Sequence, residues 1–165
     1  MILLAAIYIT IQVAVVAWFD FKTKKISNIW PLANIALFIV LPFLWPEAYR
    51  HHFEVWVVPL AFLAVGFVLF KLDVMGAGDS KYLFSLFLLV PQSLHEELLM
   101  KLLEITVVVG GSLLTWRLIT RWEEFKILIM TRVGSLKKFL GGKFTYAPVI
   151  FVAWLWFLYQ VGIRA

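Results

Sequence analysis

The sequence contains no cysteine, and only 15% of its 165 residues are charged. The absence of cysteine excludes disulfide bonds, thiol nucleophiles and zinc sites built on cysteine. A soluble domain of ordinary composition carries about 25% charged residues, whereas this chain is 63% hydrophobic. The composition therefore predicts an integral membrane protein in which residues 1–165 form a single domain, with no room for a sizeable soluble domain.

Continuous apolar runs recur along the whole chain. A helix needs about 20 residues to cross about 30 Å of hydrocarbon, and uninterrupted runs favour helices over the alternating pattern of a β-barrel. We therefore predict an all-α, polytopic membrane protein with about six transmembrane helices. The predicted spans cover residues 2–19, 29–46, 55–70, 82–94, 98–116 and 144–163.

Residues 120–143 show a different pattern. Their apolar side chains recur at spacings of three and four, and their charged and polar side chains fall mainly on the opposite side. This periodicity predicts an amphipathic helix that lies on the cytoplasmic face of the membrane. A seventh segment, buried or re-entrant, is the alternative.

The distribution of positive charge predicts the orientation of the chain. If the N-terminus is outside, every basic residue except Arg50, Lys101 and Arg164 falls on the inner side, as the positive-inside rule requires. Both termini then lie outside the cytoplasm. The net charge of +5 is explained by this topology and by contact with anionic lipid, so no nucleic-acid partner is predicted.

Two aspartates are predicted at the cytoplasmic boundary of the bundle. Asp20 ends the first span and Asp79 opens the fourth, within GAGDSK; because these spans run in opposite directions, both carboxylates reach the same face. Carboxylates at close range cannot both ionise easily and share a proton. One can then activate a water while the other polarises a peptide carbonyl. A proton- or cation-coupled transporter that uses the same pair is the alternative, and a non-enzymatic membrane assembly protein is a third possibility.

The residues around Asp79 allow two interpretations. Gly76 and Gly78 permit unusual backbone angles and leave space for an extended substrate, or they form a plain turn in which Asp79 caps the next helix. Lys81 either reaches the membrane interface or orients a substrate carbonyl. A helix from Asp79 to Glu96 would cover about 26 Å, less than the hydrocarbon thickness. This predicts that Asp79 lies slightly inside the membrane, in a water-accessible notch. No metal and no other cofactor is predicted.

Three short motifs together carry a family resemblance. The pattern D-x(5)-I-x-N, here Asp20, Ile26 and Asn28, occurs with GAGDSK and with TYAP at Thr145 to Pro148. In this combination the chain resembles the type IV prepilin peptidases, which are GxGD intramembrane aspartic proteases. Its length is similar to that of the short tight-adherence (Flp) subgroup. The resemblance implies that Asp20 and Asp79 are the catalytic pair. The supporting motif residues that it implies are Asn28, Gly76, Gly78 and Lys81.

The resemblance also implies a substrate and a place in the cell. Members of the family remove a short leader from pilin precursors with a hydrophobic N-terminal helix, on the cytoplasmic side of a prokaryotic inner membrane, and work with the pilus assembly machinery. Ser27 stands where the family often has proline. This difference is expected to make the turn less rigid. Long members carry a cytoplasmic domain with cysteine pairs and also N-methylate the product. This chain has no cysteine and no such domain, so N-methylation is not predicted.

Overall fold

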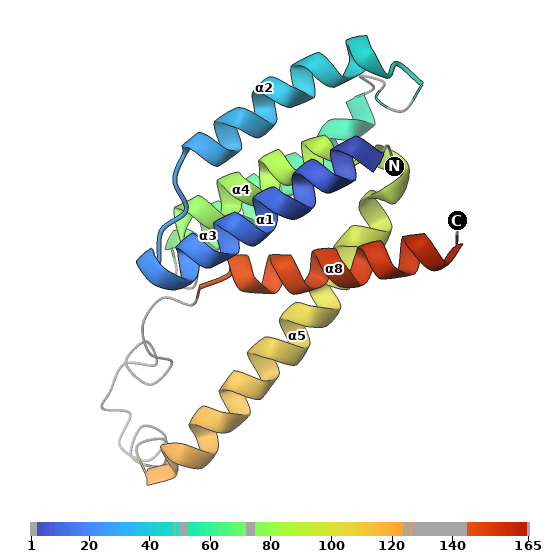
Figure 1. The fold of residues 1–165 in the computed structure, drawn as a ribbon. Helices are drawn as coiled ribbons and strands as arrows, with labels where there is room; N and C mark the ends of the chain where they lie inside the picture. The colour runs from blue at the N-terminus through green and yellow to red at the C-terminus, as the bar shows by residue number, and fades with distance from the viewer. Residues whose placement is uncertain are drawn as a thin grey trace.

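The computed structural model describes residues 3–47, 49, 53–71, 75–123, 126 and 145–164. All regular elements in these ranges are helices (Figure 1). The predicted amphipathic helix at 120–143 falls largely outside the described residues. In chain order the elements are α1 (Leu3–Thr23), α2 (Ile29–Leu44), the short 3-10 helix η1 (Phe53–Trp56), α3 (Val57–Lys71), α4 (Ala77–Leu89), the 3-10 helix η2 (Gln92–Leu94), α5 (His95–Thr120) and α8 (Ala147–Arg164).

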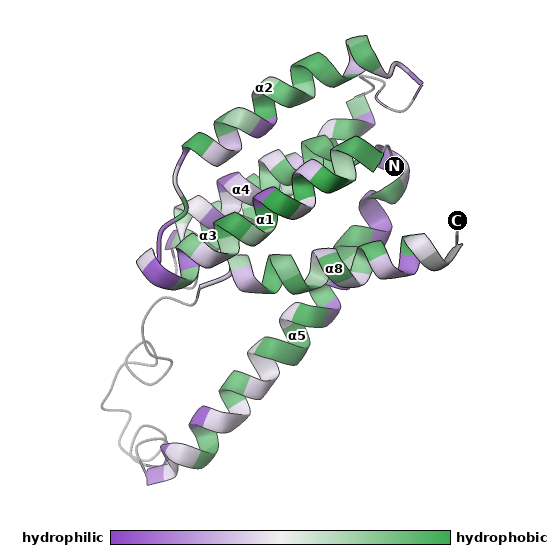
Figure 2. Ribbon diagram, viewed as in Figure 1, coloured by the Kyte–Doolittle hydropathy of each residue, from purple (hydrophilic) through white to green (hydrophobic). Residues whose placement is uncertain are grey.

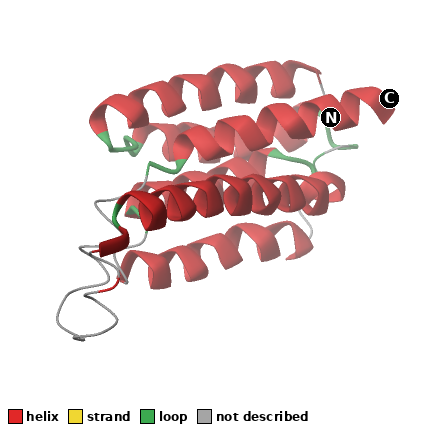
Figure 3. Ribbon diagram, turned by 90° about the horizontal axis from the view of Figure 1, so that it is seen from below, coloured by secondary structure: helices red, strands yellow, loops and turns green. Residues whose placement is uncertain are grey.

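Helix α4 forms the centre of the bundle. It packs against α2 and α3, while α1 packs against α8, and α8 packs against α5. Figures 1 and 3 show these helices packed as a bundle, and Figure 1 shows the second half of α5 extending from it. Although α4 is short and contains polar side chains, most of it is buried. Its buried residues are Asp79, Ser80, Tyr82, Leu83, Ser85, Leu86, Phe87, Leu88 and Leu89.

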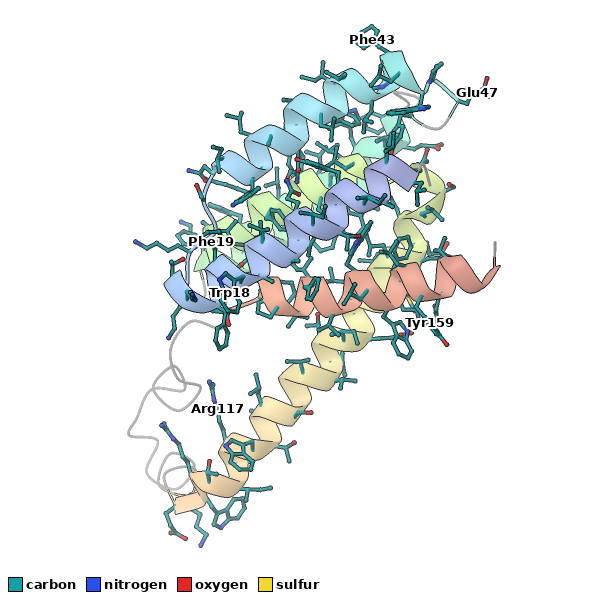
Figure 4. All side chains as sticks on the ribbon, in the orientation of Figure 1. Trp18, Phe19, Phe43, Glu47, Arg117 and Tyr159 are labelled. Atoms are coloured by element: carbon teal, nitrogen blue, oxygen red, sulfur yellow. The ribbon has the colours of Figure 1, made fainter. Side chains whose placement is uncertain are left out.

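The outer faces of the helices are apolar. Figure 2 shows hydrophobic residues along most of the helices, and large side chains such as Trp18, Phe19 and Phe43 point outward (Figure 4). Exposed apolar surface of this extent is typical of contact with lipid. The segments Leu3–Thr23, Phe53–Lys71 and Gln92–Thr120 are long and apolar enough to cross a membrane. The prediction of an all-α membrane protein is therefore confirmed.

The predicted bounds of the fourth span are wrong. The prediction placed it at 82–94, but α4 begins at Ala77 and ends at Leu89. Pro91 explains the end, because a proline disfavours helical geometry in the residue before it, and Val90 is extended with φ −87° and ψ 132°. The continuous helix expected from Asp79 to Glu96 therefore does not form. With 13 residues, α4 is only about 20 Å long.

The end of α1 also differs from the prediction. The helix continues past Asp20 to Thr23, so Asp20 lies inside its last turn. Lys24 then takes up the left-handed conformation with φ 52°, and its N–H donates to the carbonyl oxygen of Asp20 at 2.8 Å. A left-handed residue is a common way to end a helix. This turn directs the chain away from the axis of α1 and into the connection to α2.

Candidate active site

Asp20 is buried, and it is held by the start of another helix. Its side chain is 4% exposed, and Oδ2 accepts a hydrogen bond at 3.3 Å from the backbone N–H of Ala147, the first residue of α8. The N-terminus of a helix carries free N–H groups and a partial positive charge, both of which favour a carboxylate. α8 therefore supplies the polar contact that this buried carboxyl group requires.

Asp79 lies in the first turn of α4. The helix N-cap is Gly76, and the N–H of Gly76 donates to Asp79 Oδ2 at 3.0 Å. The interpretation in which Asp79 itself is the N-cap is therefore wrong: Asp79 is the third residue of the helix, and its side chain reaches back to the cap. The side chain is 5% exposed. Like Asp20, it is a buried carboxyl group at a helix N-terminus.

The two aspartates lie at the same end of the bundle. Figure 1 shows the end of α1 and the beginnings of α4 and α8 together, at the end of the bundle opposite the two chain termini. The start of α8 lies at the same end, because the N–H of Ala147 donates to Asp20.

The sequence motifs around the two aspartates also contact each other. A Cβ atom added to Gly78 would lie 3.2 Å from Ile26 Cβ and 3.3 Å from the Ile26 carbonyl oxygen, so the loop after α1 packs directly on α4 at this glycine. Lys81 is exposed, and its Nζ donates to Asn28 Oδ1 at 3.5 Å. The supporting residues predicted from the sequence thus form two contacts that join the first motif to the second.

A family model for the type IV leader peptidase family matches residues 7–119. The chain belongs to the type IV leader peptidase family. The matched range contains both aspartates and all four supporting motif residues, whereas α8 follows it. No match was found among curated proteins or among solved structures.

In this leader peptidase family member, Tyr146 adds a side chain to the site that the sequence indicated only through the TYAP motif. Thr106 Oγ1 donates to the Leu102 carbonyl oxygen at 2.5 Å and lies 2.6 Å from the Tyr146 hydroxyl. Since a threonine hydroxyl has one hydrogen, Tyr146 is the donor to Thr106. Thr106 of α5 was not predicted, because no motif marks it.

Gly76 contributes space and not an unusual backbone angle. Its φ of −74° and ψ of 145° are open to any residue, so the prediction of special backbone angles is wrong at this position. An added Cβ, however, would lie 2.9 Å from Asp79 Oδ2. The glycine therefore allows the carboxylate of Asp79 to fold back over its own helix N-terminus.

Gly76→Ala is expected to lower peptidase activity and to leave stability nearly unchanged. The new methyl group meets the mobile end of the Asp79 side chain, which can rotate away and release the N–H of residue 76. Because a misplacement of about 1 Å can cost about 10²-fold in rate, we expect a loss of that order. Initial cleavage rates and melting temperatures in detergent measure the two effects. Gly111→Ala is the matched control, since no described atom lies within 4 Å of its added Cβ; equal rates in both variants would contradict the prediction.

Proposed function

We propose that this chain is a membrane-embedded aspartic endopeptidase that removes the leader peptide from type IV, Flp-like prepilins on the cytoplasmic side of the inner membrane. Asp20 and Asp79 are the proposed catalytic pair. The observation that carries the proposal is that two buried aspartates, from separate motifs and separate helices, lie at the same end of the bundle. Membership of the leader peptidase family supports the same reaction.

The proposed chemistry needs only the two carboxyl groups and a water. One carboxylate takes a proton from the water, whose oxygen attacks the scissile carbonyl carbon. The other carboxyl group, protonated, donates to the carbonyl oxygen as the tetrahedral intermediate forms. One carboxyl group then gives its proton to the leaving amine as the C–N bond breaks, while the other, now a carboxylate, takes a proton from a hydroxyl of the intermediate, so that both groups return to their starting state. Because the backbone N–H groups of Gly76 and Ala147 hold the Oδ2 atoms, we assign the Oδ1 atoms to water and substrate.

The positive charges support the proposed orientation. Lys22 and Lys71, at the ends of α1 and α3, lie at the same end of the bundle as the aspartates. Lys22 Nζ lies 4.4 Å from the centre of the Trp18 ring, and Lys71 Nζ lies 5.4 Å from that of Phe67. Lysines beside aromatic rings are typical of the membrane interface. We therefore propose that this end faces the cytoplasm, contacts anionic lipid, and leaves both termini outside.

The length of α4 supports a site below the membrane surface. A helix about 20 Å long is shorter than the hydrocarbon layer of about 30 Å. Either the bilayer thins around α4, or at least one end of α4 lies inside the hydrocarbon layer. Asp79, in the first turn, would then lie within the membrane boundary. A water-filled notch, open to the side, would admit both the attacking water and the hydrophobic helix of the substrate.

Co-expression with an Flp-type pilin precursor tests the proposed function. We expect the precursor to shorten by the length of its leader when the chain is present and to keep its full length when it is absent. The measurement is the mass of the pilin isolated from membranes. An unprocessed precursor in membranes that contain the chain would contradict the proposal. Proton uptake that depends on Asp79, without cleavage, would instead indicate a transporter.

A further inference from the structure

A second polar cluster lies inside the bundle and begins one helical turn beyond Asp79. Five side chains form it: Tyr8 and Gln12 of α1, Asn34 of α2, and Tyr82 and Ser85 of α4. Gln12 is 3% exposed, and Asn34, Tyr82 and Ser85 are fully buried. We call this cluster the polar network. Polar groups inside a membrane bundle are costly unless they bond to one another, so their arrangement needs a reason.

The Gln12 amide group is the centre of the polar network. Its Nε2 donates to Asn34 Oδ1 at 2.6 Å and to the Tyr8 hydroxyl at 3.0 Å. Its Oε1 accepts from the Tyr82 hydroxyl at 3.3 Å. Asn34 Nδ2 in turn donates to Ser85 Oγ at 3.1 Å. Both hydrogens and the oxygen of the amide therefore have partners on three helices, which restricts how these helices can rotate or slide.

The polar network is built on the two helices that carry the aspartates. Gln12 and Asp20 both belong to the buried face of α1, eight residues or about 12 Å apart along the helix. Tyr82 follows Asp79 by three residues in α4, and both are buried. Among the described residues, the bond from Tyr82 to Gln12 is the hydrogen bond that joins α1 directly to α4. α1 otherwise packs chiefly against α8, and α4 against α2 and α3.

We propose that Gln12, Asn34 and Tyr82 are positioning residues that set the register of α1 against α4, and thereby the separation of Asp20 and Asp79. This role rests on the proposed function of the aspartate pair. In lipid the hydrophobic effect does not drive helices together, and apolar helix surfaces specify rotation and sliding poorly. A buried polar contact, in contrast, is satisfied in one register only, which is the best supported role of such groups in helical assemblies.

Tyr82→Phe tests the proposal by removing a single oxygen atom. We expect kcat for precursor cleavage to fall about 10-fold because the two carboxylates lose their alignment. KM should stay within about twofold, because the network is buried between α1, α2 and α4. Tyr8→Phe is the matched control. It removes the same atom from the same network, but among the described residues the Tyr8 hydroxyl hydrogen-bonds Gln12 of α1 and Asn34 of α2, and no side chain of α4. We therefore expect Tyr8→Phe to retain wild-type kcat.

A distance measurement separates positioning from stability and needs no substrate. The chain has no cysteine, so spin labels can be attached to cysteines introduced at the exposed positions Phe21 and Lys81. The dipolar coupling between the labels reports the offset of α1 from α4. We expect the same distance distribution with and without Tyr8→Phe, and a displaced or broadened one with Tyr82→Phe.

Two results would overturn the positioning role: equal losses of kcat in the two tyrosine variants, or an unchanged label distance in Tyr82→Phe. If the wild-type chain cleaves no prepilin, the proposed function fails, but the distance measurement still decides whether the polar network sets the register.

Discussion

Asp20→Asn and Asp79→Asn are each expected to abolish leader cleavage, with losses of at least about 10³-fold, since general acid–base catalysis contributes about 10²–10⁴-fold and each carboxyl group serves more than one step. An amide group neither takes a proton from water nor donates one as an acid. Loss of either member of the pair therefore stops the reaction, and the double variant should be no worse than the single ones. The measurement is precursor cleavage by purified protein over an extended time course.

The asparagine variants are expected to fold, which makes the result interpretable. Asparagine keeps a side-chain oxygen that can accept from the N–H of Ala147 or of Gly76, as the aspartates do now. Glu104→Gln is the matched control, because it makes the same chemical change in an exposed carboxylate paired with Lys101 at 2.7 Å. We expect it to cleave as wild type. Full cleavage by either aspartate variant would rule out the proposed pair.

Gly66→Ala is expected to destabilise the bundle and to remove cleavage as well. Gly66 of α3 packs directly on Ser80 of α4, and an added Cβ would overlap the Oγ and Cβ atoms of Ser80 and lie 3.3 Å from its Cα. The helices must then separate next to Asp79. Overpacking of this kind costs about 1–3 kcal/mol. The melting temperature in detergent and the cleavage rate measure the two losses.

Two further variants test the steric cause of this effect. Gly110→Ala places the same methyl group in α5, where no described atom lies within 4 Å, and it should leave melting and cleavage unchanged. Ser80→Gly in the Gly66→Ala background removes the overlapping atoms. It should restore part of the melting temperature and part of the cleavage rate, although a glycine in a helix costs about 0.5–1 kcal/mol. A Gly66→Ala protein that melts and cleaves as wild type would show that α3 and α4 adjust freely.

The helices were largely predictable, but the role of α4 was not. Most apolar runs became helices near the predicted positions because each run is long, continuous and bounded by polar residues. The fourth was misplaced because Pro91 ends it early, and a count of apolar residues does not register that local effect. Nor did composition indicate that this short helix, with its serines and tyrosine, occupies the centre. That position follows from the partners its polar groups find on α1 and α2.

The sequence by itself determined the helical membrane class, the two aspartate motifs and the family, because these depend on composition and on residues close together in the chain. Only the tertiary structure decided which groups hold the aspartates and align their helices. Ala147 and Asp20 are 127 residues apart, and Tyr82 and Gln12 are 70 apart. Apolar periodicity shows which side of a helix is buried, but not which helix covers it or which polar atom lies opposite. Those choices are made by packing, through the close approach at Gly66 and the single register that satisfies Gln12.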